Sequence, residues 1–204
     1  DEEVPLTITV SGTDVDTGTG PGDENVLSYT AESSNPDDVS VTMDGDQLTM
    51  DPVLNFHGTV DISVTVEDNG GLSYDEIFVF TVSPVNDAPV INAIADQNTE
   101  EDILLTIDIF GSDVDSGTSS GDENILSFTA ISSDSNLVMV STTSGDGSGD
   151  GTITFEVQQD QYGSADITVI ISDNGGLSDS TETTLTVYPI NDAPVIEQID
   201  NQVT

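Results

Sequence analysis

The sequence predicts an all-β fold of two tandem seven-stranded antiparallel sandwiches with Greek-key connections, and three observations predict it. Motifs from the first half of the 204-residue chain return in the second half in the same order. Apolar residues alternate with polar residues in short runs, which is the pattern of half-buried strands. Gly, Asn, Asp and Pro bound these runs, and no run of helical length shows a period of about 3.6 residues. Repeats of about 100 residues with several short strands are typical of sandwiches that each bury their own core.

The strands are clearest in two matching runs. In TVDISVTVE at 59–67 and SADITVIIS at 164–172, every second residue is apolar. A period of two places these residues on one face of a strand, so we expect them in the cores of the two repeats. LTITV, VLSYT and EIFVFTV supply further strands. The inward residues are Val60, Ile62, Val64 and Val66 in the first run and Ala165, Ile167, Val169 and Ile171 in the second, and the expected core aromatics are Tyr29, Phe80, Phe128 and Phe155.

The repeat boundaries follow from two offsets. DVD at 14–16 matches DVD at 113–115 at an offset of 99, and EDNGGLS at 67–73 matches SDNGGLS at 172–178 at an offset of 105. Six residues are therefore inserted in between, near the glycine-rich stretch SGDGSGDG, where a longer surface turn costs little. The segment APVIEQIDNQVT matches APVINAIADQNT at the second offset. We therefore expect a first repeat at 1–87 that lacks its first strand, a second repeat at 88–192, and the first strand of a following repeat at 193–204.

Charge is the second strong signal, because 40 Asp and Glu face no Lys or Arg and give a formal charge of −40. Two carboxylates about 4 Å apart near a surface repel by roughly 4 kcal/mol at an effective dielectric constant near 20. Close packing of these acids requires protonation, spacing or a bound divalent metal, and we expect metal. Nucleic acid is excluded as a partner because it is bound through Lys and Arg. Membrane insertion is excluded because no apolar stretch approaches about 20 residues.

Catalysis finds little support, and the chain is not expected to be an enzyme. The only histidine, His57, is replaced by Tyr162 in the second repeat, and there is no cysteine or lysine nucleophile, so a triad cannot be built. Paired carboxylates can hydrolyse glycosides, but metal binding is the better interpretation of these acids. The absence of cysteine excludes disulfides. The start DEEVPLTITV lacks the basic residues of a signal peptide, which indicates an internal fragment.

Polar motifs occur in one order, and they occur twice: an early glutamate pair, a D-x-D, an Asn, an Asp before Gly-Gly, and an Asn-Asp-Ala-Pro. This ordered set resembles the cadherin repeat, a sandwich of the Ig-like kind. It is most similar to the bacterial cadherin-like tandem repeats of large secreted adhesins, and the resemblance covers essentially the whole chain. It implies calcium ions between successive repeats, held by acids of the preceding repeat, the linker and the following repeat. It also implies an extracellular or bacterial cell-surface location.

The resemblance assigns metal ligands at the junction between the two repeats. We expect about two or three calcium ions there, with the weak affinity of extracellular modules, a dissociation constant of about 10⁻⁴ to 10⁻³ M. The animal linker begins with an aspartate where this chain has Pro84 and Pro189, so at least one ligand is missing. The base of the first repeat supplies Glu2, with Glu3 as an alternate, and Asn55. The linker supplies Val85, Asn86 and Asp87, and the second repeat supplies Asp113, Asp115, Asp173 and the backbone carbonyl of Asn124.

Two partial calcium sites are expected at the outer ends, where each set of ligands lacks a partner repeat and should bind weakly. The alternative for every acid is a solvated surface side chain, and we prefer it for Asp23, Glu24, Glu32 and Asp44. For the aspartates before Gly-Gly, the motif alone is compatible both with a hairpin turn and with a ligand. The partial sites comprise Asp14, Asp16, Asn25 and Asp68 in the first repeat and Glu101, Asp160, Asn191 and Asp192 in the second.

Two functional hypotheses follow from the resemblance. In the first, calcium straightens tandem repeats into a rod or filament that holds a distal domain away from a bacterial surface. In the second, the repeats form a calcium-dependent carbohydrate-binding or homophilic module. Carbohydrate platforms rely on exposed aromatics, and the chain has no Trp and four Tyr, which favours the rod. The expected partners are neighbouring repeats and, by head-to-tail self-association through 193–204, further copies of the chain; polysaccharide is the alternative partner.

Overall fold

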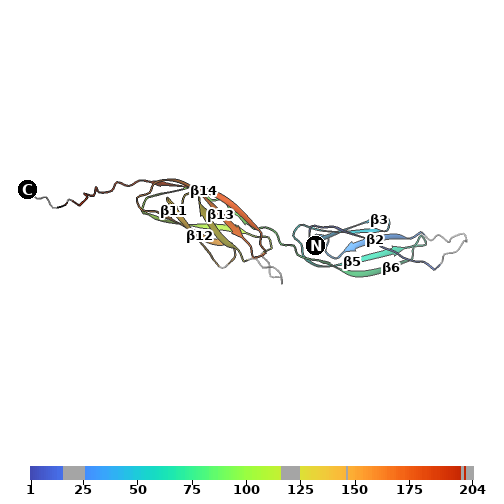
Figure 1. The fold of residues 1–204 in the computed structure, drawn as a ribbon. Coiled ribbons are helices and arrows are strands. Elements are labelled where there is room, and N and C mark those ends of the chain that lie inside the picture. Colours follow the sequence, from blue (N-terminus) through green and yellow to red (C-terminus); the bar gives the residue numbers. More distant parts are fainter. Residues whose placement is uncertain (16–25, 116–124, 146, 199, 201–204) are drawn as a thin grey trace, which may run out of the picture. The chain divides into compact units, whose positions relative to one another are not determined.

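The structure is a computed structural model that describes residues 1–15, 26–115, 125–145, 147–198 and 200. It divides into two compact units, unit 1 at Asp1–Val85 and unit 2 at Asn86–Thr204 (Figure 1). The regular elements of the described residues are all strands. No helix among these residues is long and apolar enough to cross a membrane.

Unit 1 is a sandwich of two three-stranded antiparallel sheets. Its strands are β1 (Leu6–Thr9), β2 (Ser28–Ser33), β3 (Val39–Asp44), β4 (Gln47–Pro52), β5 (Gly58–Glu67) and β6 (Ser73–Val82). One sheet has the order β1-β4-β3, and the other has the order β2-β5-β6. β5 and β6 form a long hairpin in which Glu67 pairs with Ser73 next to the turn.

The core of unit 1 follows from the alternation along β5. Val60, Ile62 and Val64 are 4%, 0% and 7% exposed and pack against Leu48 and Met50 of β4. Val66, the next residue in the alternation, is only half-buried. The β5–β6 turn contains Gly71 with a φ of 86°, a conformation that glycine adopts without steric cost.

Unit 2 is a sandwich of two four-stranded sheets. Its strands are β7 (Val90–Ile91), β8 (Gln97–Glu100), β9 (Leu104–Ser112), β10 (Ser127–Ser132), β11 (Val138–Ser144), β12 (Asp150–Val157), β13 (Gly163–Ser172) and β14 (Ser178–Tyr188). The strand orders are β11-β12-β9-β7 and β10-β13-β14-β8. All pairs are antiparallel except β8 with β14, which is parallel.

The core of unit 2 confirms the predicted inward face of β13. Ala165, Ile167, Val169 and Ile171 are all at most 3% exposed. The predicted core aromatics divide between the two units. Phe128 and Phe155 are 5% and 0% exposed in unit 2, whereas Tyr29 and Phe80 are only half-buried in unit 1.

The all-β class and the two tandem sandwiches are confirmed, and the described residues form six strands in unit 1 and eight in unit 2, close to the seven expected in each. In unit 2 the first segment is divided, because β7 joins the sheet of β9 and β8 joins the sheet of β14.

Candidate metal centre

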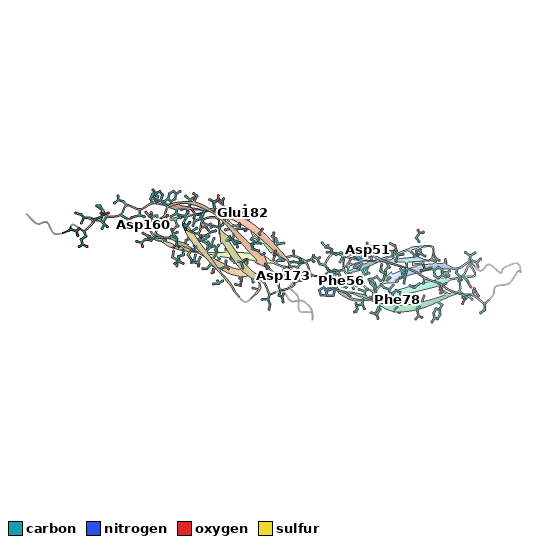
Figure 2. The ribbon with its side chains drawn as sticks, viewed as in Figure 1. Asp51, Phe56, Phe78, Asp160, Asp173 and Glu182 are labelled. Atoms are coloured by element: carbon teal, nitrogen blue, oxygen red, sulfur yellow. The ribbon has the colours of Figure 1, made fainter. Side chains whose placement is uncertain are left out.

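Polar side chains gather at the end of unit 2 where the chain enters it. Asn86 and Asp87 precede β7, Asp113 and Asp115 follow β9, and Asp173 follows β13. We call these five residues the entry cluster. The acids after β9 and β13 stand directly at strand ends, so the sheets hold them on a rigid frame. Figure 2 shows Asp173 at this end of unit 2 and Asp160 at the opposite end.

Hydrogen bonds tie the members of the entry cluster to one another. The backbone N–H of Asp87 donates to Asp115 Oδ2 over 2.5 Å, and the backbone N–H of Asp115 donates to Asp113 Oδ1 over 3.0 Å. Asn86 Nδ2 donates to Asp173 Oδ2 over 2.9 Å. Asp87 and Asp115 each offer a carboxylate oxygen, and the two atoms lie within 4.8 Å of one another. Carboxylates from separate loops therefore face one small region, where they repel unless a cation lies among them.

Asp113 carries a buried oxygen with no hydrogen-bond partner. Its side chain is 6% exposed, and Oδ2 is enclosed without any donor. An unsatisfied buried polar group costs about 1–3 kcal/mol, and a charged one costs more. No side chain of the protein can offer a Lys or Arg cation, since the sequence contains neither. This oxygen is therefore a candidate ligand for a cation from solvent.

Burial raises the pKa of Asp113 above its ordinary value of 3.8, because desolvation disfavours the charged carboxylate. The hydrogen bond from the backbone of Asp115 lowers the pKa, but it does not compensate. The negative charges of Asp115, Asp173 and Asp87 raise the pKa of Asp113 further. Without a metal, Asp113 thus holds its proton more tightly than an exposed aspartate, and a divalent cation would act in the opposite direction.

The pKa of Asp173 is shifted in the opposite direction to that of Asp113. Burial by itself raises its pKa, but hydrogen bonds to the charged form outweigh that effect and leave the pKa below 3.8. The N–H groups of Gly176 and Leu177 lie 2.5 and 2.8 Å from Asp173 Oδ1. The remaining donors are the side chain of Asn86 and the backbone of Gly175. Asp173 therefore stays ionised at neutral pH, as a metal ligand must.

In a chelating buffer, we expect unit 2 to lose stability as the pH rises from 3.8 through the raised pKa of Asp113. A carboxyl with a raised pKa binds more protons in the folded state, so its stabilising contribution is complete below the unfolded pKa and is lost as the pH rises. Asp173, with a lowered pKa, contributes above 3.8 and loses its contribution only as the pH falls below that value.

Thermal melting over a pH series checks this expectation, with Asp113→Asn as the control. The variant should lack the part of the pH dependence that lies above 3.8. Identical pH profiles for the two proteins would contradict the assignment to Asp113.

Gly175 has a role beyond the turn predicted from the sequence. A Cβ built at this position would lie 2.4 Å from Asn86 Oδ1, closer than real Cβ contacts come. The absent side chain therefore lets Asn86 reach Asp173. Of the Gly-Gly pair, only Gly176 has a positive φ, at 98°. The repeated Gly-Gly pair was the available signal for this contact, although a hairpin turn also accounts for the pair.

A second group of acids lies at the opposite end of unit 2. Asp102, Asp160 and Asp192 each offer a carboxylate oxygen, and these atoms all lie within 4.8 Å of one another. We call these three residues the exit cluster, and all three are exposed. Asp102 was not predicted for this end, although its counterpart Glu3 was named as an alternate ligand. The offset of 99 was the signal that could have found it.

Glu101 stands beside the exit cluster and is only 3% exposed. Its Oε1 accepts a hydrogen bond from the backbone N–H of Ile190 over 2.5 Å. Asn191 adds a hydrogen bond from Nδ2 to the carbonyl of Asp192 over 3.3 Å. A buried glutamate therefore fixes the start of the segment that carries Asn191 and Asp192.

Unit 1 repeats this arrangement at its own base. Glu2 is 2% exposed, and its Oε1 accepts a hydrogen bond from the backbone N–H of Val85 over 2.6 Å. Glu2 Oε2 is buried with no hydrogen-bond partner, which makes it the second orphaned carboxylate oxygen of the described residues. The apolar side chain of Val85 offers no ligand atom, so only its carbonyl could bind a metal.

The backbone conformations near these buried glutamates also agree between the two units. Glu3 and Asn55 have φ values of 63° and 60°, and their counterparts Asp102 and Asp160 have 60° and 55°. A positive φ is uncommon outside glycine, and Asn and Asp tolerate it better than most residues. The same two positions therefore present their side chains from the same unusual backbone conformation in both units.

The remaining predicted ligands lie at the far end of unit 1 or outside the described residues. Asp14 and Asp68 line one groove of unit 1, together with Leu72 and Tyr74. Asp16, Asn25 and Asn124 lie outside the described residues.

Residues 86–186 match the family model described as a bacterial Ig domain. No curated protein matches the sequence. Several solved structures resemble the fold. The structure of PcdhgB3 EC1-4 is 18% identical with a TM-score of 0.55, and the match covers 81% of this chain and 41% of that one.

Human CDH23 EC21-23 is 17% identical with a TM-score of 0.48, and the match covers 79% of this chain and 62% of that one. An endo-fucoidan hydrolase, MfFcnA4 from glycoside hydrolase family 107, is 18% identical with a TM-score of 0.37, over 82% of this chain. The chain spans only 24% of that hydrolase, and less than two thirds of each of the three structures.

Proposed function

We propose that this chain, which is built of Ig-like, cadherin-like repeats and whose second repeat belongs to the bacterial Ig domain family, is a calcium-rigidified structural and adhesion segment of a long extracellular bacterial protein. Domains of these families are typically structural rather than enzymatic, and they typically lie outside the cell or at its surface. The finer claim, that calcium binds this chain and stiffens it, is our proposal.

The single observation that carries the proposal is the buried Oδ2 of Asp113 in a chain without Lys or Arg. An anionic oxygen in that position needs a cation, and the chain can obtain one only from solution. The entry cluster offers carboxylate and amide oxygens and no nitrogen or sulfur ligand. Calcium takes six to eight oxygen ligands of this kind, whereas transition metals favour imidazole or thiolate.

We propose the following role for each residue of the calcium site. Asp87, Asp113, Asp115 and Asp173 provide carboxylates, and Asn86 orients Asp173 through its side-chain hydrogen bond. Glu2 is the ligand that we propose from the first repeat, because its Oε2 is buried without a partner. Glu3, Asn55, the carbonyl of Val85 and the carbonyl of Asn124 complete the proposed set. The exit cluster would bind a further ion weakly, because all its members are exposed.

Calcium bound there would do two things. It would neutralise carboxylates that otherwise repel one another in a chain of formal charge −40. It would also favour the folded state by mass action: one site with a dissociation constant of about 1 mM in about 10 mM calcium contributes about 1.4 kcal/mol. Several ions bound at one cluster would stabilise the folded state more than a single ion does.

The test is thermal melting and small-angle X-ray scattering in calcium, in magnesium and in chelator. The melting temperature should climb with calcium concentration, and the radius of gyration should increase as the segment between the repeats stiffens. Magnesium should act more weakly, because it needs a near-octahedral site and loses its waters reluctantly. Identical melting and scattering curves in calcium and chelator would reject the proposal.

A carbohydrate-binding role stays a prediction from the sequence. A glycan array probed in calcium and in chelator separates it from the structural role. Calcium-dependent binding to a defined polysaccharide would establish a binding module, whereas a calcium-dependent change of scattering without glycan binding supports the structural segment.

A further inference from the structure

The β11–β12 hairpin of unit 2 is longer than its counterpart in unit 1, the β3–β4 hairpin. The register is the same in both, because residues of β3 and β4 pair as their counterparts at the offsets of 99 and 105 do. The six inserted residues are therefore 144–149, with the sequence SGDGSG, and we call them the inserted segment. In unit 1 the turn consists of Gly45 and Asp46 alone, between the paired residues Asp44 and Gln47.

The inserted segment is hydrogen-bonded to both sheets of unit 2. The backbone N–H of Gly111, in β9, donates to the carbonyl of Gly149 over 2.8 Å. The backbone N–H of Leu126, which directly precedes β10, donates to the carbonyl of Gly147 over 3.0 Å. Since β9 and β10 belong to different sheets, the inserted segment joins the two sheets.

These two bonds lie at the described ends of the connection that carries two members of the entry cluster. Gly111 stands two residues before Asp113, and the connection ends at Leu126. Asp113 and Asp115 are 6% and 9% exposed. The inserted segment therefore holds the chain on both sides of two buried carboxylates.

The inserted segment packs against the core, although the sequence predicted a surface turn there. Gly147 and Gly149 are buried. A Cβ built at Gly149 would lie 2.2 Å from the carbonyl oxygen of Gly111 and 3.3 Å from Leu126 Cδ1. The φ of Gly149 is 100°, which other residues rarely adopt. Only glycine therefore allows the segment to approach β9 this closely.

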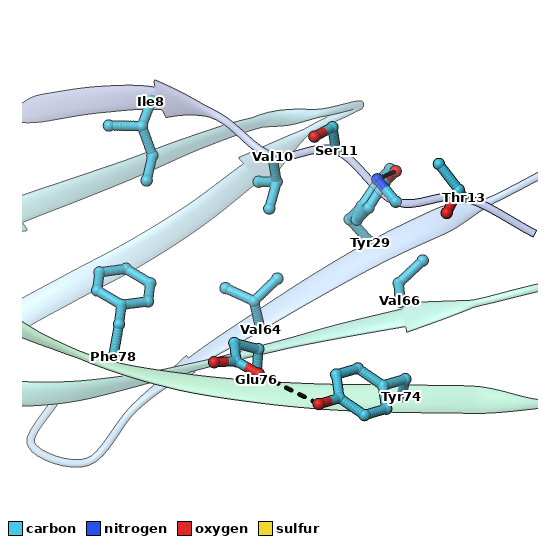
Figure 3. Close-up of a pocket in the computed structure, with 11 residues that line it drawn as sticks. Ile8, Val10, Ser11, Thr13, Tyr29, Val64, Val66, Tyr74, Glu76 and Phe78 are labelled. Atoms are coloured by element: carbon cyan, nitrogen blue, oxygen red, sulfur yellow. Dashed lines mark hydrogen bonds between the residues drawn. The ribbon is translucent and has the colours of Figure 1, made fainter.

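In unit 1 a side chain accepts the equivalent hydrogen bond. Gly12, the counterpart of Gly111, donates its backbone N–H to Tyr29 Oη over 2.7 Å. Figure 3 shows Tyr29 at this part of unit 1, along an open groove between the two sheets. The counterpart of Tyr29 is Phe128, which has no hydroxyl group. A backbone N–H shielded from water needs an acceptor, and in unit 2 the inserted segment provides it.

We propose that the inserted segment is a positioning element for the metal site of unit 2, which keeps Asp113 and Asp115 in the arrangement that binds calcium. This inference rests on the proposed calcium binding. No ligand is assigned to the segment itself. Without it, the binding-competent arrangement would be populated only part of the time, and the apparent dissociation constant would rise in inverse proportion to that fraction.

Deletion of residues 144–149 is the direct test. Thr143 and Thr152 are already paired, and the deletion makes Asp150 and Gly151 the two turn residues between them. Asp-Gly is a preferred sequence for a two-residue hairpin turn. The variant should therefore keep the register of β11 and β12 and lose the bonds of the inserted segment.

Gly149→Ala is a second variant that answers the same question if the deletion fails to fold, because its Cβ would meet the carbonyl oxygen of Gly111. Val187→Ala is the control for a general loss of stability. Val187 is 2% exposed and pairs with Gly163 at the start of β13, whereas Asp173 follows the end of that strand. It weakens unit 2 at the end opposite the entry cluster.

Calorimetric titration with calcium measures the effect on the site. The deletion and Gly149→Ala should each raise the dissociation constant about tenfold, which corresponds to 1.4 kcal/mol. Val187→Ala should lower the melting temperature in chelator and leave the dissociation constant within about twofold of the wild type, since its site stays intact. A purely structural role of the inserted segment would change stability without this difference in affinity.

Hydrogen exchange in chelator provides a readout that needs no calcium. The backbone N–H groups of Asp115 and Asp87 donate to Asp113 and Asp115 within the entry cluster. Their exchange should speed up in the deletion variant by more than the loss of global stability accounts for, and it should not do so in Val187→Ala.

Three results would overturn the inference alone: wild-type calcium affinity in a folded variant without the inserted segment, an equal loss of affinity in Val187→Ala, or unchanged exchange at Asp87 and Asp115. A wild type that binds no calcium would instead reject the proposed function, and this inference with it.

Discussion

Asp113→Asn is expected to raise the melting temperature of unit 2 in chelator and to lower it in calcium. In chelator the substitution removes a buried carboxylate whose Oδ2 has no partner and whose pKa is raised by burial and by three neighbouring aspartates. Asparagine keeps an oxygen for the N–H of Asp115 but carries no charge, so the substitution removes the desolvation cost and the repulsion of a buried carboxylate. In calcium the substitution removes a charged ligand, so the stabilisation by mass action falls.

This reversal of sign distinguishes a ligand from a residue that serves packing alone, because a packing defect lowers stability under both conditions. Asp108→Asn is the matched control, since Asp108 lies exposed on β9, the strand that Asp113 follows. It should change the melting temperature little in either buffer. A loss of stability for Asp113→Asn in both buffers would contradict the expectation.

Phe155→Ala is expected to have the largest effect on folding. Phe155 is 0% exposed and lies in the core cluster of unit 2. Truncation of a buried phenylalanine costs about 3–5 kcal/mol, against a total of about 5–15 kcal/mol for a typical domain. The unfolding transition of unit 2 should therefore fall by more than about 10 °C.

Differential scanning calorimetry measures this effect and assigns it to one unit. Phe110→Ala is the control, since Phe110 is 47% exposed on β9 and should cost little. The transition of unit 1 should stay in place, because the two units have separate core clusters. An equal fall for both variants would show that the core of unit 2 is assigned wrongly.

The fold class could be predicted because a strand has a period of two and a sandwich buries one face of it. The alternation in Ala165, Ile167, Val169 and Ile171 needs no knowledge of other strands. The division of residues 90–100 into β7 and β8 could not be predicted in this way. It depends on which sheet each short piece pairs with, and such pairing is a long-range contact without a local signature.

Burial in unit 1 shows the same limit. Tyr29 was predicted in the core from its place in an apolar run, yet it lines the open groove and is half-buried. Its counterpart Phe128 is 5% exposed and lies in the core cluster of unit 2. The period of a strand therefore predicts the face on which a side chain lies, but not how far the rest of the fold covers it.

For the site, the repeated order of motifs named all five residues of the entry cluster, and the structure brings them together. That they bind calcium stays a prediction. The sequence could not reveal that Asp113 Oδ2 lacks a donor, because satisfaction of a buried oxygen depends on every neighbouring backbone group. It also could not reveal that Gly175 makes room for Asn86, since this contact joins residues of a turn and of a distant linker.

Calorimetric titration of the chelator-treated chain with calcium tests the central claim most directly. The account predicts saturable binding of about two or three ions with a dissociation constant of about 10⁻⁴ to 10⁻³ M. It also predicts that Asp113→Asn loses this binding while Asp108→Asn keeps it. The absence of saturable binding by the wild type, or the same isotherm for wild type and Asp113→Asn, would contradict the account.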